Sequence, residues 1–183
     1  MKREECAMEQ ERFLAVVDAS IKLVYSKDSK LFEVEVGERA IAHRLAIYLE
    51  ESCVFDDYSV DCEYNRYGVE GMVKRLPGIE RCRRTNEPKD WITPDIVIHR
   101  RQSEERDNLA VFEIKSFGSL DACDKLKLKG MTKRTGAFRY DFGIGIEFRR
   151  EYYNWFLVVN GVKRKGLGRV DIEQGERSSI TRV

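Results

Sequence analysis

The chain has 183 residues, of which 42% are apolar and 36% are charged, and its formal net charge at pH 7 is +1. This length and composition indicate a single folded domain and exclude a disordered chain or one that needs cross-links to hold a small core. A net charge this close to zero does not by itself indicate a nucleic-acid-binding protein.

No run of 18 consecutive apolar residues occurs, so we expect no transmembrane helix and no membrane partner. The N-terminal sequence MKREECAMEQER is charged and lacks the apolar run of a signal peptide, which favours a cytoplasmic location. The five cysteines are widely spaced and form no CxxC pair, so reduced and mostly buried thiols are expected rather than disulfides or a zinc site.

Residues 5–25 are predicted to form a helix because their apolar residues recur at helical spacing. A second helix is predicted from Gly37 to Glu51, with an apolar stripe made of Ile41, Ala42, Leu45 and Leu49. Residues 58–64 alternate between apolar and polar side chains, which predicts a strand. All three prolines lie between residues 77 and 94, and this segment is predicted to be a long loop.

Four further strands and one helix are predicted along the rest of the chain. The strands are residues 95–99, 109–117, 140–148 and 155–159, and the helix is residues 119–129, closed by Gly130. Asn160 and Gly161 predict a tight turn after the last strand, and the polar tail from about residue 172 is expected to fray. The order predicts one α/β or α+β domain over residues 1–183, with a core of about 37–160 and a mixed sheet flanked by helices.

Two carboxylates and a lysine are predicted to share one patch of this sheet. If His99 pairs with Leu109 around a loop at 100–108, Asp95 lies opposite Glu113. Side chains alternate along a strand, so Glu113 and Lys115 point to the same face. Facing carboxylates repel each other unless they share a cation such as Mg²⁺, which prefers oxygen ligands. The alternative is an ion pair between Lys115 and Asp95, with Glu113 exposed.

Glu38 lies in the first turn of the second helix, in line with its apolar stripe. An acid at such a position suggests a third metal ligand or a group that orients water. The alternative is a favourable negative charge at the helix N-terminus. Neither histidine, His43 or His99, is expected to be catalytic, and the chain has no GxSxG or Cys–His pattern for nucleophilic catalysis.

Pro94-Asp95 and Glu113-Ile114-Lys115, between a helix with Glu38 and a lysine-rich helix, resemble the restriction-endonuclease-like PD-(D/E)xK superfamily. The strings HRLAIYLE, VDCEYNR, PDIVIHR, LAVFEIK and DKL resemble a group of short prokaryotic members, and the likeness covers roughly residues 37–148. The resemblance implies an αβββαβ core and hydrolysis of phosphodiester bonds that depends on Mg²⁺ or Mn²⁺.

The resemblance also implies a role for each residue of the motif. Asp95 and Glu113 are expected to bind the metal, together with the backbone carbonyl of Ile114, and Glu38 is a possible extra ligand. Lys115 is expected to position the attacking water. The superfamily often carries a further polar residue on the following helix, for which the candidates are Asp124, Lys125 and Lys127.

Basic residues after the motif are expected to hold the nucleic-acid backbone. They are Lys125, Lys127, Lys129, Lys133 and Arg134, and Asn65 and Arg66 are further candidates for substrate contact. DNA is favoured over RNA as the substrate. The alternatives are that these charges form a solvated face, or that the protein is a catalytically silent module that binds nucleic acid or a partner, as an accessory subunit or a homodimer.

Overall fold

The computed structural model describes residues 2–52, 55, 57–68, 70–81, 90–101, 108–164 and 167–172, with side chains from Gln10 onward except that of Arg81. Residues 82–89 and 102–107 of the predicted loops, and the tail beyond 172, lie outside the described residues.

Helices and strands alternate irregularly along the chain. The helices are α1 (Lys2–Lys27), α2 (Lys30–Glu33), α3 (Glu38–Glu51) and α4 (Ala122–Thr132), with a 3₁₀ turn η1 at Ile79–Arg81. The strands are β1 (Ser59–Cys62), β2 (Arg66–Tyr67), β3 (Met72–Val73), β4 (Ile96–His99), β5 (Asn108–Ser116), β6 (Phe142–Phe148), β7 (Tyr152–Val159), β8 (Val162–Lys163) and β9 (Arg169–Asp171). The two long predicted helices and the predicted strands are confirmed, whereas α2 and the short strands β2, β3, β8 and β9 were not predicted.

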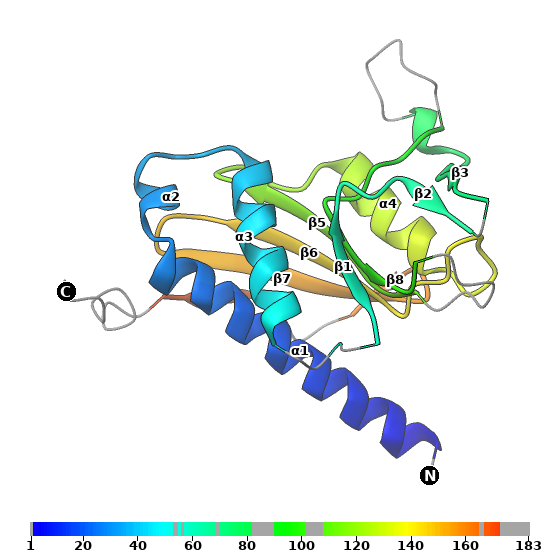
Figure 1. The fold of residues 1–183 in the computed structure, drawn as a ribbon, viewed down its shortest axis with the longest axis horizontal. Helices are drawn as coiled ribbons and strands as arrows, with labels where there is room; N and C mark the ends of the chain where they lie inside the picture. The colour runs from blue at the N-terminus through cyan, green and yellow to red at the C-terminus, as the bar shows by residue number, and fades with distance from the viewer. Residues whose placement is uncertain are drawn as a thin grey trace.

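The main sheet has the order β1-β4-β5-β6-β7-β8, and β9 also pairs with β7. Strands β5 and β6 are parallel, because the chain crosses between them through α4, and the other neighbours are antiparallel. Strands β2 and β3 form a separate pair. The fold is therefore α+β with a mixed central sheet flanked by helices (Figure 1).

The sheet buries apolar side chains on both faces. Helices α1 and α3 cover the face that carries Phe112 and Ile114, and α4 covers the face that carries Val97 and Val111. The alternation predicted for β5 is thus confirmed. The predicted stripe of α3 is also confirmed, since Ile41, Ala42, Leu45 and Leu49 are all buried.

The hairpin of β4 and β5 has the predicted register at one end only. Ile96 pairs with Phe112 and Ile98 with Ala110, and this register places Asp95, just before β4, opposite Glu113. A β-bulge between Ile98 and His99 shifts the other end, so that His99 pairs with Asn108. The predicted pair of His99 with Leu109 is therefore wrong, because a bulge adds one residue to one strand.

Gly130 was predicted to close the helix at residues 119–129, but α4 continues through it to Thr132. A Cβ atom added at Gly130 would lie 2.5 Å from Cδ1 of Leu76. This glycine therefore leaves room for the Leu76 side chain and does not end the helix. The predicted turn at Asn160 and Gly161 is confirmed, with φ angles of 50° and 73°.

The prediction of reduced and mostly buried thiols is wrong for Cys123. Cys62 is a free thiol but lies exposed on β1, at the edge of the sheet. Cys123 is disulfide-bonded, and the side chain of its partner lies outside the described residues. Spacing along the sequence does not reveal which cysteines a fold brings together. Among the described residues, no helix is long and apolar enough to cross a membrane.

Candidate functional site

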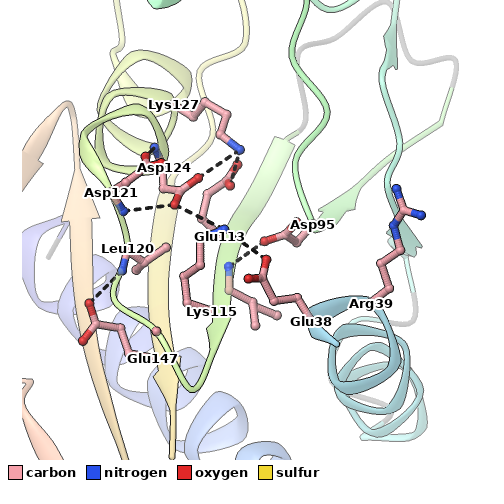
Figure 2. A network of polar contacts seen from close by, with 12 residues as sticks. Glu38, Arg39, Asp95, Glu113, Lys115, Leu120, Asp121, Asp124, Lys127 and Glu147 are labelled. Carbon is pink, nitrogen blue, oxygen red and sulfur yellow. Dashed lines mark hydrogen bonds and ion pairs between the residues drawn. The ribbon is translucent and has the colours of Figure 1, made fainter. Parts of the chain in front are cut away.

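Four carboxylates and two lysines gather where β5 passes between α3 and α4 (Figure 2). The carboxylates are Glu38 on α3, Asp95 before β4, Glu113 on β5 and Asp124 on α4. The lysines are Lys115 on β5 and Lys127 on α4. The sequence predicted that Glu38, Asp95, Glu113 and Lys115 come together, and in this group the carboxylates outnumber the ammonium groups by two.

Glu113 is the most deeply buried acid of the group, with a side chain that is 1% exposed. Its Oε2 atom accepts a hydrogen bond from Lys127, while Oε1 is buried without a hydrogen-bond partner in the described part of the chain. Burial raises the pKa of Glu113 well above its ordinary value; the charge of Lys127 opposes this shift and that of Asp95 adds to it. A buried carboxylate oxygen without a donor is costly, so this atom is available to a ligand.

Asp95 is held by the backbone of the neighbouring strand. Its Oδ2 atom accepts a hydrogen bond of 2.6 Å from the N–H of Ile114, which fixes the carboxylate beside Glu113. Burial raises the pKa of Asp95, although the hydrogen bond from Ile114 opposes this shift. The alternative arrangement, with Glu113 exposed, is wrong because Glu113 is buried.

Lys115 lies at the more open side of the group. Its Nζ atom is 3.0 Å from Oε2 of Glu38 and 3.6 Å from Oδ2 of Asp124. Burial lowers the pKa of Lys115, but the hydrogen bond to Glu38 and the charge of Asp124 outweigh it and raise the pKa above its ordinary value. Lys115 therefore stays protonated at neutral pH, and its side chain is 26% exposed, so it can reach a bound substrate.

Helix α4 brings Asp124 and Lys127 to the same place. Lys127 contacts Glu113 and lies 3.4 Å from Oδ1 of Asp124, and its side chain is only 13% exposed. Lys127 was predicted both as a contact for nucleic acid and as a candidate for the further polar residue on this helix, and the structure places it inside the group together with Asp124. The reason is the helical period, which puts residues 124, 127, 128 and 131 on the stripe that faces the sheet, whereas Lys125 is exposed.

The start of α4 is fixed by two acids that the sequence analysis missed. Asp121 caps the helix: its Oδ1 atom accepts the N–H of Asp124 at 2.9 Å, and Oδ2 of Asp124 accepts the N–H of Asp121 at 3.1 Å. Oε1 of Glu147 accepts the N–H of Leu120 at 3.0 Å. The spacing Asp121-x-x-Asp124 is that of a capping box, so the first of these roles could have been read from the sequence.

The other predicted contact residues lie apart from the carboxylates. Lys125, Lys129, Lys133 and Arg134 are exposed on α4 or just after it, Arg66 is exposed on β2, and Asn65 precedes β2. None of them forms an ion pair with the four carboxylates in the part of the chain that the structure describes. Neither histidine contacts the four carboxylates among the described residues: His43 is exposed, and Nε2 of His99 lies 2.9 Å from Oδ2 of Asp61 on β1.

The described residues contain no group of three or more His, Cys, Asp or Glu side chains arranged to hold a metal ion. Asp95 and Glu113 nevertheless offer the oxygen donors that Mg²⁺ prefers, and Mg²⁺ often needs only one or two carboxylates because it keeps several waters. The unpartnered Oε1 atom of Glu113 fits such an ion. Both oxygens of Glu113 could bind the ion only if Lys127 first left Oε2.

Comparisons of this chain with protein-family models, curated proteins and solved structures found no match. Its function is therefore inferred from the geometry of the site.

Proposed function

We propose that the protein is a metal-dependent nuclease that hydrolyses phosphodiester bonds in nucleic acid, more readily in DNA than in RNA. The observation that carries this proposal is Glu113, a buried carboxylate with an unpartnered oxygen beside Asp95 and two lysines. The order α3, β1, β4, β5, α4, β6 supports a restriction-endonuclease-like core. A cytoplasmic location remains part of the proposal.

The residues of the group divide the work of hydrolysis between them. Asp95 and Glu113 would hold Mg²⁺ or Mn²⁺, together with the carbonyl of Ile114 and with Glu38 as a further ligand. The cation supplies an activated water and positive charge for the phosphate. Lys115 orients the water and stabilises the negative charge that develops on the phosphate. In the absence of substrate, Glu38 and Asp124 hold the Lys115 ammonium in place.

Substrate binding is assigned to the exposed cations near the group. Lys125, Lys129, Lys133 and Arg134 lie on or just after α4 and can neutralise backbone phosphates, as can Arg66 with help from Asn65. Contacts of this kind are independent of base sequence. Selectivity would then depend on the shape of the nucleic acid or on a partner, including a second copy of the chain.

The test is incubation with single- and double-stranded DNA and RNA, with Mg²⁺ or Mn²⁺. Cleavage by the wild type is expected to fall by roughly a hundredfold or more in Lys115→Ala and in Glu113→Gln, because each loses a group that acts on the reacting phosphate or its cation. Glu33→Gln, an exposed acid on α2, is the matched control and should cleave normally. Circular dichroism should show that Glu113→Gln still folds; an unfolded variant would mean that Glu113 is structural.

A second candidate function is a silent module on the same fold, which binds nucleic acid or a protein partner without cleaving. Two observations favour it: Lys127 already neutralises part of Glu113, and no three-ligand metal group occurs among the described residues. Binding of nucleic acid by the wild type, with no cleavage of any of the four substrates in either metal, would support the module and contradict the nuclease.

A further inference from the structure

A cavity of about 360 Å³ lies at the opposite end of the sheet from the predicted catalytic group. Its lining includes Leu109 and Phe142, close to the starts of β5 and β6, and Phe13 of α1. Glu113 is four residues further along β5 than Leu109, which corresponds to about 13 Å of strand. Its side chain also points to the face covered by α4, whereas Phe13 packs on the other face. The cavity is therefore separate from the carboxylates.

Three arginines and one carboxylate, that of Asp141, line this cavity, so its charged side chains carry a net positive charge. Arg12, Arg134 and Arg139 all line it and all are exposed, and none forms an ion pair with a carboxylate of the described residues. The side chain of Arg139 has only a hydrogen bond of 3.3 Å from Nε to the carbonyl of Gly136. Guanidinium groups are the donors best suited to phosphate, because their planar N–H groups match its oxygens in pairs.

The inner wall of the cavity is aromatic. The rings of Phe13 and Phe142 are stacked with centroids 4.5 Å apart, and Phe55 meets Phe13 edge-on at 6.0 Å. These rings are only 4% to 8% exposed and the faces of Phe13 and Phe142 lie against each other, so a flat aromatic ligand would pack against the ring edges at the cavity surface while an anionic group attached to it reaches the arginines. Oδ1 of Asn160, which also lines the cavity, accepts the N–H of Arg134, and its amide nitrogen is left to donate to a ligand.

We propose that this cavity binds a nucleoside phosphate, with the base on the phenylalanine wall and the phosphate between Arg12, Arg134 and Arg139. The volume is near the lower end of the range for pockets that enclose small ligands, which suits one nucleotide and not a strand of several. The ligand is either a free nucleotide or the terminal nucleotide of a strand. This site does not depend on the proposed nuclease activity.

The binding test is isothermal titration of the full chain, without divalent cations, with AMP, GMP, CMP and UMP in turn. At least one of these nucleotides should bind saturably, at one site per chain. Ribose 5-phosphate and inorganic phosphate should bind at least roughly tenfold more weakly, because they lack the base. A 5′-phosphorylated trinucleotide that binds more tightly than any mononucleotide identifies a strand end as the natural ligand. Absence of binding by all four nucleotides, or equal binding of ribose 5-phosphate, overturns the proposal.

Substitution of the arginines locates the site. Arg12→Gln and Arg139→Gln should each weaken nucleotide binding about tenfold or more, since each removes a charge-assisted hydrogen bond to phosphate, and neither residue belongs to the proposed nuclease site. Arg164→Gln, an exposed arginine outside the cavity, is the matched control and should bind like the wild type. Glu113→Gln should also bind normally, so a failure of the nuclease proposal leaves this result unchanged. Wild-type affinity in both cavity variants would place the nucleotide elsewhere.

Discussion

Two charged clusters, one around Asp61 and one around Glu113, lie on the face of the sheet that α4 covers. The pKa shifts of these two carboxyl groups have opposite directions. Asp61 on β1, which pairs with Val97, accepts hydrogen bonds of 2.9 Å from His99 and 2.8 Å from Arg101. Burial raises the pKa of Asp61, but the bonds from Arg101 and His99 outweigh it and lower the pKa below its ordinary value. At Glu113 burial prevails and the pKa rises.

The difference between the two carboxyl groups indicates which cluster has a functional role. Both oxygens of Asp61 have donors, so this cluster is complete without a ligand and serves the fold. Glu113 keeps a buried oxygen without a donor and lies among other carboxylates. A site that the fold alone leaves unsatisfied is where a ligand or a reaction is expected.

Each cluster also has a buried lysine beside it. Lys74 is fully buried, and its Nζ atom donates a 2.7 Å hydrogen bond to the carbonyl of Tyr64 and lies 4.7 Å from the Tyr64 ring. Burial lowers its pKa to about 7. The pKa of Lys127 is lowered by burial too, but the charge and hydrogen bond of Glu113 reverse this and raise it. The variants described below test the difference between these two clusters and their lysines.

The largest effect is expected for Lys74→Met, measured by urea unfolding at pH 6 and pH 9. The pKa of Lys74 is about 7 in the folded state against 10.5 ordinarily, so between these values the unfolded chain binds more protons and the wild type gains stability as pH rises. Below pH 7 Lys74 is protonated in the folded state too, and burying its charge lowers the free energy of unfolding by at most ~5 kcal/mol. Lys74→Met should remove this slope, and Lys133→Met, on the surface, should keep it. Equal slopes in all three proteins would contradict the lowered pKa.

Lys127→Met should lower the free energy of unfolding by ~3 kcal/mol, because it leaves the carboxyl of Glu113 buried without its cation. The double variant Glu113→Gln/Lys127→Met should recover much of this loss, since neither charge then remains. Lys125→Met, on the exposed side of the same helix, is the control. Chemical denaturation of the wild type, Glu113→Gln, Lys127→Met and the double variant gives the interaction energy directly, and additive effects would mean that the pair is not coupled.

Asp61→Asn should lower the free energy of unfolding by ~2 kcal/mol at pH 7, because the bonds from Arg101 lose their charge assistance. Asp57→Asn is the matched control: its side chain is 83% exposed and lies 3.4 Å from Arg100, so its loss should cost less than ~0.5 kcal/mol. Thermal unfolding of both variants measures the two losses of stability. A loss no larger than that of Asp57→Asn would show that the Asp61 cluster contributes little to the fold.

The smallest effect, ~1 kcal/mol, is expected for Asp121→Ala, which removes the N-cap of α4. Ser29→Ala provides the control, because Ser29 precedes α2 and makes no side-chain cap hydrogen bond. Both can be measured by urea unfolding. Equal losses from the two substitutions would mean that the capping box does not stabilise α4.

Local rules of the sequence were enough to predict some of the site. Alternation along β5 and the hairpin register brought Asp95 opposite Glu113, and helical spacing brought Glu38 into line with the buried stripe of α3. Both patterns repeat over a few residues, so they are visible in one sequence.

Other features depend on how distant elements pack. Lys115 contacts Glu38, 77 positions away, and not Asp95, its partner in the alternative arrangement, because α3 and α4 both reach the same end of β5. The bulge at His99 and the disulfide of Cys123 leave no periodic signal either. These features are determined by tertiary contacts, which one sequence does not reveal.

The contact of Lys127 with Glu113 makes this lysine an internal competitor for any cation that the carboxylates bind. Under the proposed function, metal binding would be an exchange, in which a divalent ion displaces an ammonium group that the protein itself supplies. The apparent affinity for metal is reduced by the fraction of time that the ammonium occupies the oxygen. A chain with this arrangement would rest in a stable, closed form at low metal concentration and become competent only when metal and the phosphates of a substrate arrive together.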